Sequence, residues 1–201
     1  MTDAGRLVQL RVEEVSAEAL EEISTISIRY RVGSVLHVHL NDAGMTGVSL
    51  VERPLARPYD KDYDTFAGEG PLRWACRFDL ANWGLITAWS EGRRVGSAVI
   101  AWDTPEVWML EGRNDLACLW DLRVAPALRG TGIGRRLFHR VEQWAIARDC
   151  QQLKVETQNT NVPACRFYVR QGCRLGGINL HAYPEVPDEV QLLWYKDLSK
   201  R

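Results

Sequence analysis

The sequence predicts a single domain of mixed α/β fold, in which helices flank a central sheet, and three observations carry this prediction. Strand-like runs at Trp83 to Trp89 and Arg94 to Trp102 flank a glycine-containing turn, which predicts an antiparallel hairpin. A strand-like run at Ala117 to Val124, a helical pattern from Ile133 and a strand-like run at Leu153 to Thr157 predict a parallel strand–helix–strand crossover. With 201 residues, 46% of them hydrophobic, the chain is long enough to bury one substantial core.

The charge balance and the cysteine pattern exclude several classes of function. The formal net charge of −1 argues against general nucleic-acid binding, which usually requires a basic stripe. No stretch approaches the roughly 18 apolar residues of a membrane helix, and no signal-peptide pattern opens the chain, so we expect a cytoplasmic protein without a membrane partner. The five cysteines contain no CxxC pair, so neither a disulfide framework nor a metal site is indicated.

The first third of the chain carries weaker signals. Leu7 to Val12 is strand-like, and Ser16 is a candidate cap for a short helix. Val35 to Leu40 is a further strand, whose alternation puts His37 and His39 on one face. Two histidines at this spacing suit a metal, but no third ligand follows nearby, so histidines with ordinary polar partners are favoured.

Asn41 to Gly70 is rich in glycine and proline, which predicts long irregular loops. Loops of this length inside a compact domain are often functional. This segment includes an acidic and aromatic cluster, whose charge and ring faces suit a cationic ligand. We therefore take Tyr59, Asp60 and Tyr63 as candidate residues for binding a cationic substrate, although a solvated charged loop is the favoured interpretation of the segment.

The most specific motif is the glycine-rich turn Arg129-Gly130-Thr131-Gly132-Ile133-Gly134, between a strand and a helix. Closely spaced glycines let backbone N–H groups converge, and the helix start adds a positive dipole, so the turn suits a diphosphate. The dinucleotide fingerprint fails, because it requires glycine where this chain has Arg135. The nucleotide-triphosphate loop fails too, because no Gly-Lys-Ser/Thr ends the turn. A tight helix entry without a ligand is the structural alternative.

The helix that follows the second strand of the crossover has readable ends. Asn161 can cap it, Pro163 fits its first turn, and Gly172 can end it. Two further strands, Gly176 to Leu180 and Glu189 to Asp197, close the chain.

Two motifs in this order carry a resemblance to a known family. The RxxGxG turn after Val124-Ala125-Pro126, followed by Asn161, Ala164 and Tyr168 in the pattern Asn-x-x-Ala-x-x-x-Tyr, resembles the GNAT superfamily of acyl-CoA N-acyltransferases. Within the superfamily, four segments resemble streptothricin acetyltransferases: Glu156 to Cys165, Leu175 to Ile178, Val38 to Asp42 and Arg57 to Tyr63. The similarity runs from about Val35 to Tyr195. Position 120 departs from it, since that group carries a glutamate where this chain has Trp120.

The resemblance implies a mostly antiparallel sheet with one parallel strand pair splayed around acyl-CoA. Residues 1–80 would form a variable acceptor-side region, and residues 81–198 the acyl-CoA-binding core, within a single domain over residues 1–201. A bulge near Leu122 or Val124 is implied, where a backbone N–H would bind the oxyanion. The residues assigned to acetyl-CoA binding are Leu122, Arg123, Val124, Arg129, Gly130, Thr131, Gly132, Ile133, Gly134, Arg135, Asn161, Ala164 and Phe167.

Amide formation sets the requirements for the catalytic residues. An amine is mostly protonated at neutral pH, so Asp121 and Glu156 are candidates for removing its proton or binding it. Asp121 can instead form an ordinary ion pair with Arg123, which alternation puts on the same strand face. Tyr168 fills the role of proton donor to the leaving thiolate by the family pattern, with an aromatic packing role as the alternative. Trp120, beside Asp121, is a candidate acceptor contact.

These residues predict an acetyl-CoA-dependent N-acetyltransferase that acts on a primary amine of a small cationic acceptor, with streptothricin-type antibiotics first. We expect direct attack in a ternary complex, because no histidine is placed to activate Cys165 as a nucleophile. Polyamines, amino sugars and protein amines are alternative acceptors. A non-catalytic acyl-CoA-binding regulatory module is the alternative outside enzymes, and either a monomer or a homodimer is compatible with the sequence.

Overall fold

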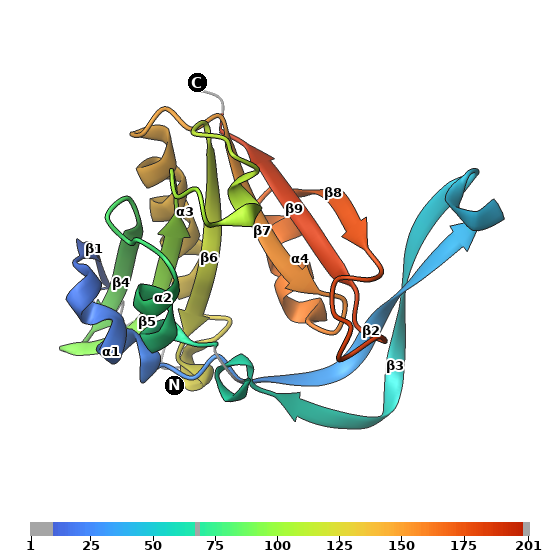
Figure 1. The fold of residues 1–201 in the computed structure, drawn as a ribbon. Coiled ribbons are helices and arrows are strands. Elements are labelled where there is room, and N and C mark those ends of the chain that lie inside the picture. Colours follow the sequence, from blue (N-terminus) through green and yellow to red (C-terminus); the bar gives the residue numbers. More distant parts are fainter. Residues whose placement is uncertain (1–9, 67–68, 199–201) are drawn as a thin grey trace. The chain divides into compact units, whose positions relative to one another are not determined.

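The computed structural model describes residues 10–66 and 69–198, which divide into two compact units. The described part of the first unit covers residues 10–28, 63–66, 69–154 and 197–198. The second unit covers Arg29–Asp62 and Val155–Lys196. Strand β7 (Gln152–Gln158) begins in the first unit and ends in the second. Figure 1 labels the elements of both units.

The first unit is built on an antiparallel sheet with the strand order β1-β4-β5-β6. Its strands are β1 (Arg11–Val15), β4 (Gly84–Ser90), β5 (Arg93–Ala101) and β6 (Leu116–Val124). The predicted hairpin is confirmed as β4 and β5. Its turn residues Glu91 and Gly92 both have positive φ angles, 50° and 72°, as the right-handed twist of a two-residue hairpin favours.

The predicted crossover joins β6 to β7 through helix α3 (Ile133–Ile146). The main-chain amides of Gln151 and Gln152 donate to the carbonyl oxygen of Asp115, at 2.7 and 3.3 Å. Since Asp115 directly precedes β6, the two strands start side by side and run in the same direction. The parallel strand pair of the prediction is therefore present.

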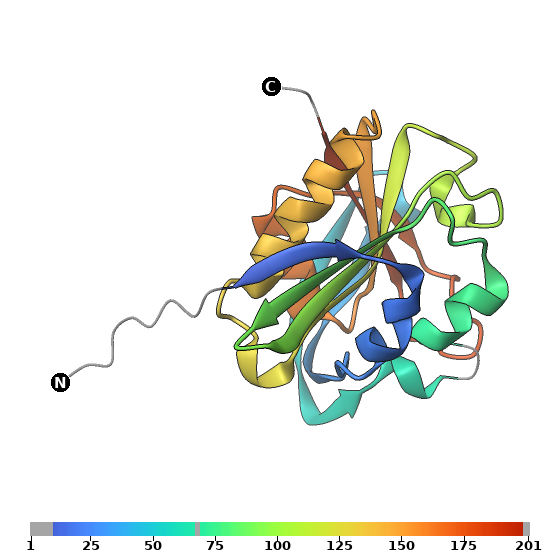
Figure 2. The same ribbon diagram turned by 90° about the vertical axis from the view of Figure 1, so that its left-hand side faces the viewer.

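Helices cover both faces of this sheet. Figure 2 shows α3 on one face and the short helices α1 (Leu20–Ser24) and α2 (Pro71–Arg77) on the other. Helix α3 packs because its apolar residues recur at helical spacing: Leu137, Val141 and Trp144 are at most 1% exposed. The core of the unit therefore lies in two layers, on either side of the sheet.

The second unit contains the strand order β7-β9-β8, with β8 (Arg174–Asn179) and β9 (Gln191–Asp197) antiparallel. Helix α4 (Val162–Arg170) follows β7. The side-chain oxygen of Asn161 accepts from the amide of Ala164 at 3.3 Å, so the predicted cap is confirmed.

A long two-stranded ribbon in the same unit corrects one prediction. Strand β2 (Tyr30–Asn41) includes the predicted strand, but β3 (Gly47–Lys61) runs through a segment that we predicted as irregular loops. The prediction treated its prolines as evidence against a strand. Proline is excluded from central strands, however, and not from edge strands. Both strands of a two-stranded ribbon have a free edge, so Pro54 and Pro58 fit.

The N-terminal predictions are partly corrected. The first described strand is Arg11–Val15 rather than Leu7 to Val12, and residues 7–9 lie outside the described residues. Ser16 makes no side-chain capping hydrogen bond, and a 3₁₀ turn (Ala17–Ala19) precedes α1. Within residues 10–66 and 69–198 there is no helix that is long and apolar enough to cross a membrane.

Candidate active site

The glycine-rich turn in the first unit has the geometry of an anion cradle. Gly130 and Gly132 adopt φ angles of 81° and 95°, which other residues rarely adopt, and the space beside each Cα is open. Helix α3 starts directly after Gly132, and among the described residues no side chain caps it. The amides of Ile133, Gly134 and Arg135 in its first turn therefore point out of the helix, an arrangement typical of anion-binding sites.

Arg129 and Thr131 hold this turn in shape. The Arg129 guanidinium donates to the carbonyl oxygens of Val124 and Ser27, each at 3.0 Å. The Thr131 hydroxyl donates to the carbonyl oxygen of Leu128 at 2.7 Å. Burial lowers the pKa of Arg129. Both side chains thus fix the loop, and a direct contact of Arg129 with the donor stays a prediction.

Strand β6 contains a bulge, although not where we expected it. The register of β6 against β5 shifts between Leu119 and Asp121, which leaves Trp120 as an extra residue. The expected place was near Leu122 or Val124. An extra residue bends a strand and changes the alternation of its side chains, so it re-aims the residues that follow.

The bulge puts Trp120 and Asp121 on the same face of β6. Val124 lies opposite Gly96, which is so close to α3 that a Cβ there would be 3.0 Å from Leu137. Strand alternation therefore directs Val124 toward α3 and Asp121, three residues earlier, toward the α1 and α2 face. Trp120 lies on that face too, because its ring meets Phe78 from the end of α2. Trp120 and Asp121 therefore both lie on the face of β6 opposite α3.

The main-chain amides of Leu122 and Val124 point away from β5. The amide of Ala125 donates to Val95 of β5 at 2.9 Å, and in an antiparallel pair alternate residues bond to the same neighbour. The amides of Leu122 and Val124 therefore point to the other edge of β6, where β7 starts. This orientation suits the predicted oxyanion contact.

Asp121 forms the ion pair that we kept as its alternative role. Arg123 Nε lies 2.9 and 3.0 Å from the two Asp121 carboxylate oxygens, and its terminal nitrogens bind Asp64 at 2.6 and 2.8 Å. The exposed fractions of the Arg123, Asp121 and Asp64 side chains are 1%, 4% and 28%. Burial raises the pKa of Asp121, while the Arg123 guanidinium opposes this shift. Burial lowers the pKa of Arg123, but the two carboxylates outweigh it, so Arg123 stays charged.

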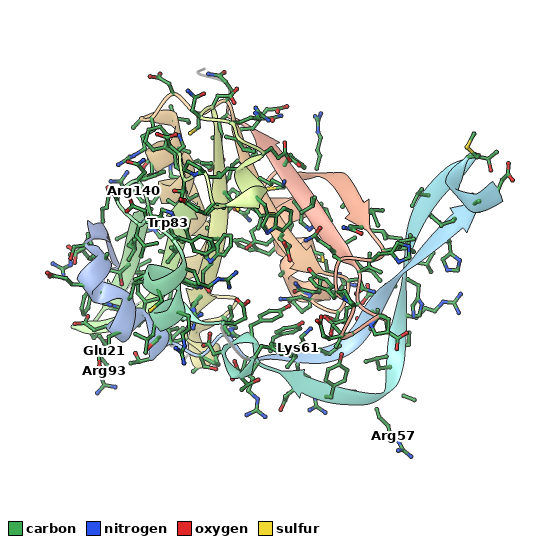
Figure 3. The ribbon with its side chains drawn as sticks, viewed as in Figure 1. Glu21, Arg57, Lys61, Trp83, Arg93 and Arg140 are labelled. Atoms are coloured by element: carbon green, nitrogen blue, oxygen red, sulfur yellow. The ribbon has the colours of Figure 1, made fainter. Side chains whose placement is uncertain are left out.

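Trp120 belongs to an aromatic group on the same face. Its ring centroid lies 5.3 Å from that of Phe78 and 5.5 Å from that of Trp83. Trp83, labelled in Figure 3, is buried and donates its indole N–H to Thr104 at 3.0 Å. Trp120 itself is half-buried, so part of its ring is available to a ligand.

The second unit holds the remaining donor-side residues on α4. Tyr168 is buried, and its ring lies 5.2 Å from the ring of the half-buried Phe167 in an edge arrangement. Asn161 and Ala164 share the capping hydrogen bond described above. Both roles that we considered for Asn161, as cap and as donor contact, use different atoms of its amide, so the cap does not exclude the contact.

Glu156 is the centre of a polar network in the second unit. Tyr183 donates its hydroxyl proton to Glu156 Oε1 at 2.6 Å, and Gln191 donates to Oε2 at 2.8 Å. Gln158 approaches both Tyr183 and Glu156, at 2.8 and 3.3 Å. Sequence reasoning found Glu156 but missed Tyr183 and Gln191, because no motif marks residues 27 and 35 positions away.

The predicted acceptor residues at the end of β3 fall in both units. Asp60 forms ion pairs with Arg29 at 2.8 Å and Arg31 at 3.5 Å in the second unit. Tyr59 is partly exposed, and burial, followed by the Glu189 charge, raises its pKa. Tyr63 opens the first unit's 3₁₀ turn Tyr63–Thr65. Next to it, Asp64 binds Arg123, a contact that no sequence motif indicates.

Lys61, labelled in Figure 3, ends β3. Its buried ammonium group pairs with Glu189. Within the described residues, no group of three or more histidine, cysteine or acidic side chains is arranged to hold a metal ion. Cys76, Cys118, Cys150, Cys165 and Cys173 are all free thiols.

Comparison with known proteins agrees with this geometry. The model of the Acetyltransferase (GNAT) family matches residues 52–173. A streptothricin acetyltransferase from Escherichia coli is 32% identical over 189 residues, which cover 92% of each chain. A streptothricin acetyltransferase from Streptomyces lavendulae is 26% identical over 152 residues, 76% of each chain.

Solved structures show the same fold. The crystal structure of nourseothricin acetyltransferase has a TM-score of 0.73 at 23% identity, covering 94% of this chain and 99% of that one. A Bacillus anthracis protein described as a streptothricin acetyltransferase, in complex with acetyl coenzyme A, gives the same values. Together with the cradle at the start of α3, the family match has one conclusion. The chain belongs to the Acetyltransferase (GNAT) family and is an acetyl-CoA-dependent N-acetyltransferase.

Proposed function

We propose that this enzyme acetylates a primary amine of a small cationic antibiotic of the streptothricin type, and so confers resistance to it. The observation that carries this proposal is the 32% identity to the Escherichia coli streptothricin acetyltransferase across 92% of both chains. Because the acyl donor is acetyl-CoA, we place the reaction in the cytoplasm.

We propose that the two halves of the reaction use opposite faces of the strands. In the first unit, α3 and its cradle lie on one face of β6, and Trp120 and Asp121 lie on the other. In the second unit, the α4 face of β7 is marked by Thr157, which meets Cys165 at 3.3 Å, and Glu156 alternates to the opposite face. In each unit the acceptor-side carboxylate thus lies across the strand from the donor-side helix.

Glu156 is the better of the two carboxylates for meeting the acceptor ammonium. Asp121 is 4% exposed and already engaged with Arg123. Glu156 is half-buried and held by hydrogen bonds from an uncharged phenol and two uncharged amides. We assign the amine-binding and proton-accepting role to Glu156, directly or through a water, and a supporting role to Asp121.

The chemistry balances without a covalent enzyme intermediate. The acceptor ammonium loses one proton to Glu156, the free amine attacks the thioester carbonyl carbon, and the carbon–sulfur bond breaks. Tyr168 gives its proton to the thiolate and regains one from the new amide nitrogen, so each turnover releases one proton. Burial, with Thr157 opposing it, raises the pKa of Cys165 to about 11, which keeps this thiol protonated and argues against an acyl-cysteine.

The proposal is tested by following thiol release from acetyl-CoA with a panel of amines: streptothricin, a polyamine, an amino sugar and a peptide N-terminus. We expect streptothricin to give the highest kcat/KM, and bacteria expressing the chain to survive higher streptothricin concentrations. Tyr168→Phe should bind CoA normally and lose at least 100-fold in kcat. Preference for another amine in the panel would refute the acceptor assignment.

A further inference from the structure

The hydroxyl group of Tyr183 has a fixed direction in the second unit. Gln158 Nε2 donates to the Tyr183 oxygen at 2.8 Å, so this oxygen acts as acceptor on that side. Its own proton then points at Glu156 Oε1, 2.6 Å away. Burial, followed by the nearby Glu156 charge, raises the pKa of Tyr183, so the phenol keeps this proton at neutral pH. The phenol is therefore a permanent donor to Glu156.

The second carboxylate oxygen has a donor of its own. Gln191, the first residue of β9 and 4% exposed, donates to Glu156 Oε2 at 2.8 Å. These three donors come from different parts of the second unit: Gln158 from β7 itself, Tyr183 from the segment between β8 and β9, and Gln191 from β9. Tyr183 is the titratable one of the three. With both oxygens held, the carboxylate has one orientation on its face of β7.

Such a network acts on the charged form of the carboxylate. Hydrogen bonds to a carboxylate favour ionisation, while burial opposes it, and Glu156 is half-buried. Neutral donors add no positive charge, so they stabilise the carboxylate without competing with a cation for it. This combination suits a carboxylate that must attract an ammonium group.

We infer that Tyr183 is a positioning residue for acceptor binding: through its hydrogen bond it holds the Glu156 carboxylate in the orientation that meets the amine of a cationic acceptor. The inference rests on the role of Glu156 under the proposed function. It adds that the segment between β8 and β9, which supplies Tyr183, contributes to acceptor recognition.

Tyr183→Phe tests the inference, because it removes the hydroxyl and keeps the ring. Tyr195→Phe is the matched control, since it makes the same change in β9, where the ring packs on Gly176. The first measurement needs no acceptor: the pKa of Glu156 is followed by ¹³C NMR of labelled glutamate carboxylates, with the resonance assigned from Glu156→Gln. We expect the pKa to rise by about one pH unit in Tyr183→Phe and to stay unchanged in Tyr195→Phe.

The second measurement is steady-state kinetics with the best amine of the panel. In Tyr183→Phe, we expect the acceptor KM to rise about tenfold, the acidic limb of kcat/KM to move upward with the Glu156 pKa, and the Kd of acetyl-CoA to stay within twofold. An unchanged Glu156 pKa, or an equal change in Tyr195→Phe, would overturn the positioning role whatever the acceptor. A shifted pKa with unchanged acceptor kinetics would instead overturn the role of Glu156 in the proposed function, and with it the link to acceptor binding.

Discussion

Substitution of Gly132 separates the cost of backbone strain from the loss of donor binding. Gly132 has φ 95° at the start of α3, and a Cβ there would meet no atom within 4 Å. Gly132→Ala therefore clashes with nothing in the protein. Its two expected effects are the left-handed backbone penalty and the intrusion of a methyl group into the space where we place the diphosphate.

The two effects have different magnitudes and different controls. An L-residue in the left-handed region costs about 1–2 kcal/mol of folding free energy. Loss of one hydrogen bond to a charged phosphate costs about 1.5–3 kcal/mol, or roughly 10- to 150-fold in Kd. Gly92, in the hairpin turn between β4 and β5, has φ 72° and the same open surroundings. Gly92→Ala therefore introduces the same backbone strain at a site away from the glycine-rich turn.

The assay pairs urea denaturation with calorimetric titration of CoA for both variants. We expect both to lose about 1–2 kcal/mol of unfolding free energy, and Gly132→Ala alone to bind CoA at least tenfold more weakly. If Gly132→Ala binds CoA within twofold of the wild type, or if Gly92→Ala weakens binding equally, then the turn does not act as the diphosphate cradle.

Three further predictions concern buried groups. Cys76 should be the one thiol that iodoacetamide labels rapidly at pH 7.5, because it is exposed and the other four are buried. Burial raises the pKa of Cys165 to about 11, so its labelling should increase only as the pH approaches that value. Rapid labelling of Cys165 at pH 7.5 would refute this prediction. The buried Trp194 N–H donates to the Thr157 hydroxyl at 2.8 Å, and Thr157→Val removes this acceptor. We expect Thr157→Val to lose about 1–3 kcal/mol of unfolding free energy in urea denaturation, and Thr157→Ser to retain most of it. Asp121→Asn removes one of the two carboxylates that bind the buried Arg123, and should lose about 1–3 kcal/mol of unfolding free energy in the same assay. The loss stays limited because Asp64 still neutralises Arg123. A loss under about 0.5 kcal/mol would show that the Asp121 charge contributes little.

Local signals predicted several backbone features well. The cradle, the hairpin turn and the cap at Asn161 each depend on a few neighbouring residues whose backbone preferences are strong, and the structure has all three. The parallel crossover followed from the order of strand, helix and strand. The comparisons confirm the family resemblance, which rests on the glycine-rich turn and on the pattern that begins at Asn161.

The acceptor side depends on contacts that are distant in sequence. Strand β3 is stabilised by pairing with β2, so its proline content gave the wrong prediction. The bulge at Trp120 is a property of two strands in register, and no single strand shows it. Asp64 and Tyr183 gain significance only from Arg123 and Glu156, which lie 59 and 27 residues away.

Within the part of the chain that the structure describes, no side chain caps the start of α3, and this links binding of the acyl donor to the stability of the protein. Water must serve the first amides of this helix when the donor is away, whereas α4 carries its own Asn161. A ligand that binds only the native state stabilises it by about 2.7 kcal/mol at a concentration of 100 Kd. Acetyl-CoA should therefore protect the enzyme from heat and proteases, and should do so more strongly as its concentration rises.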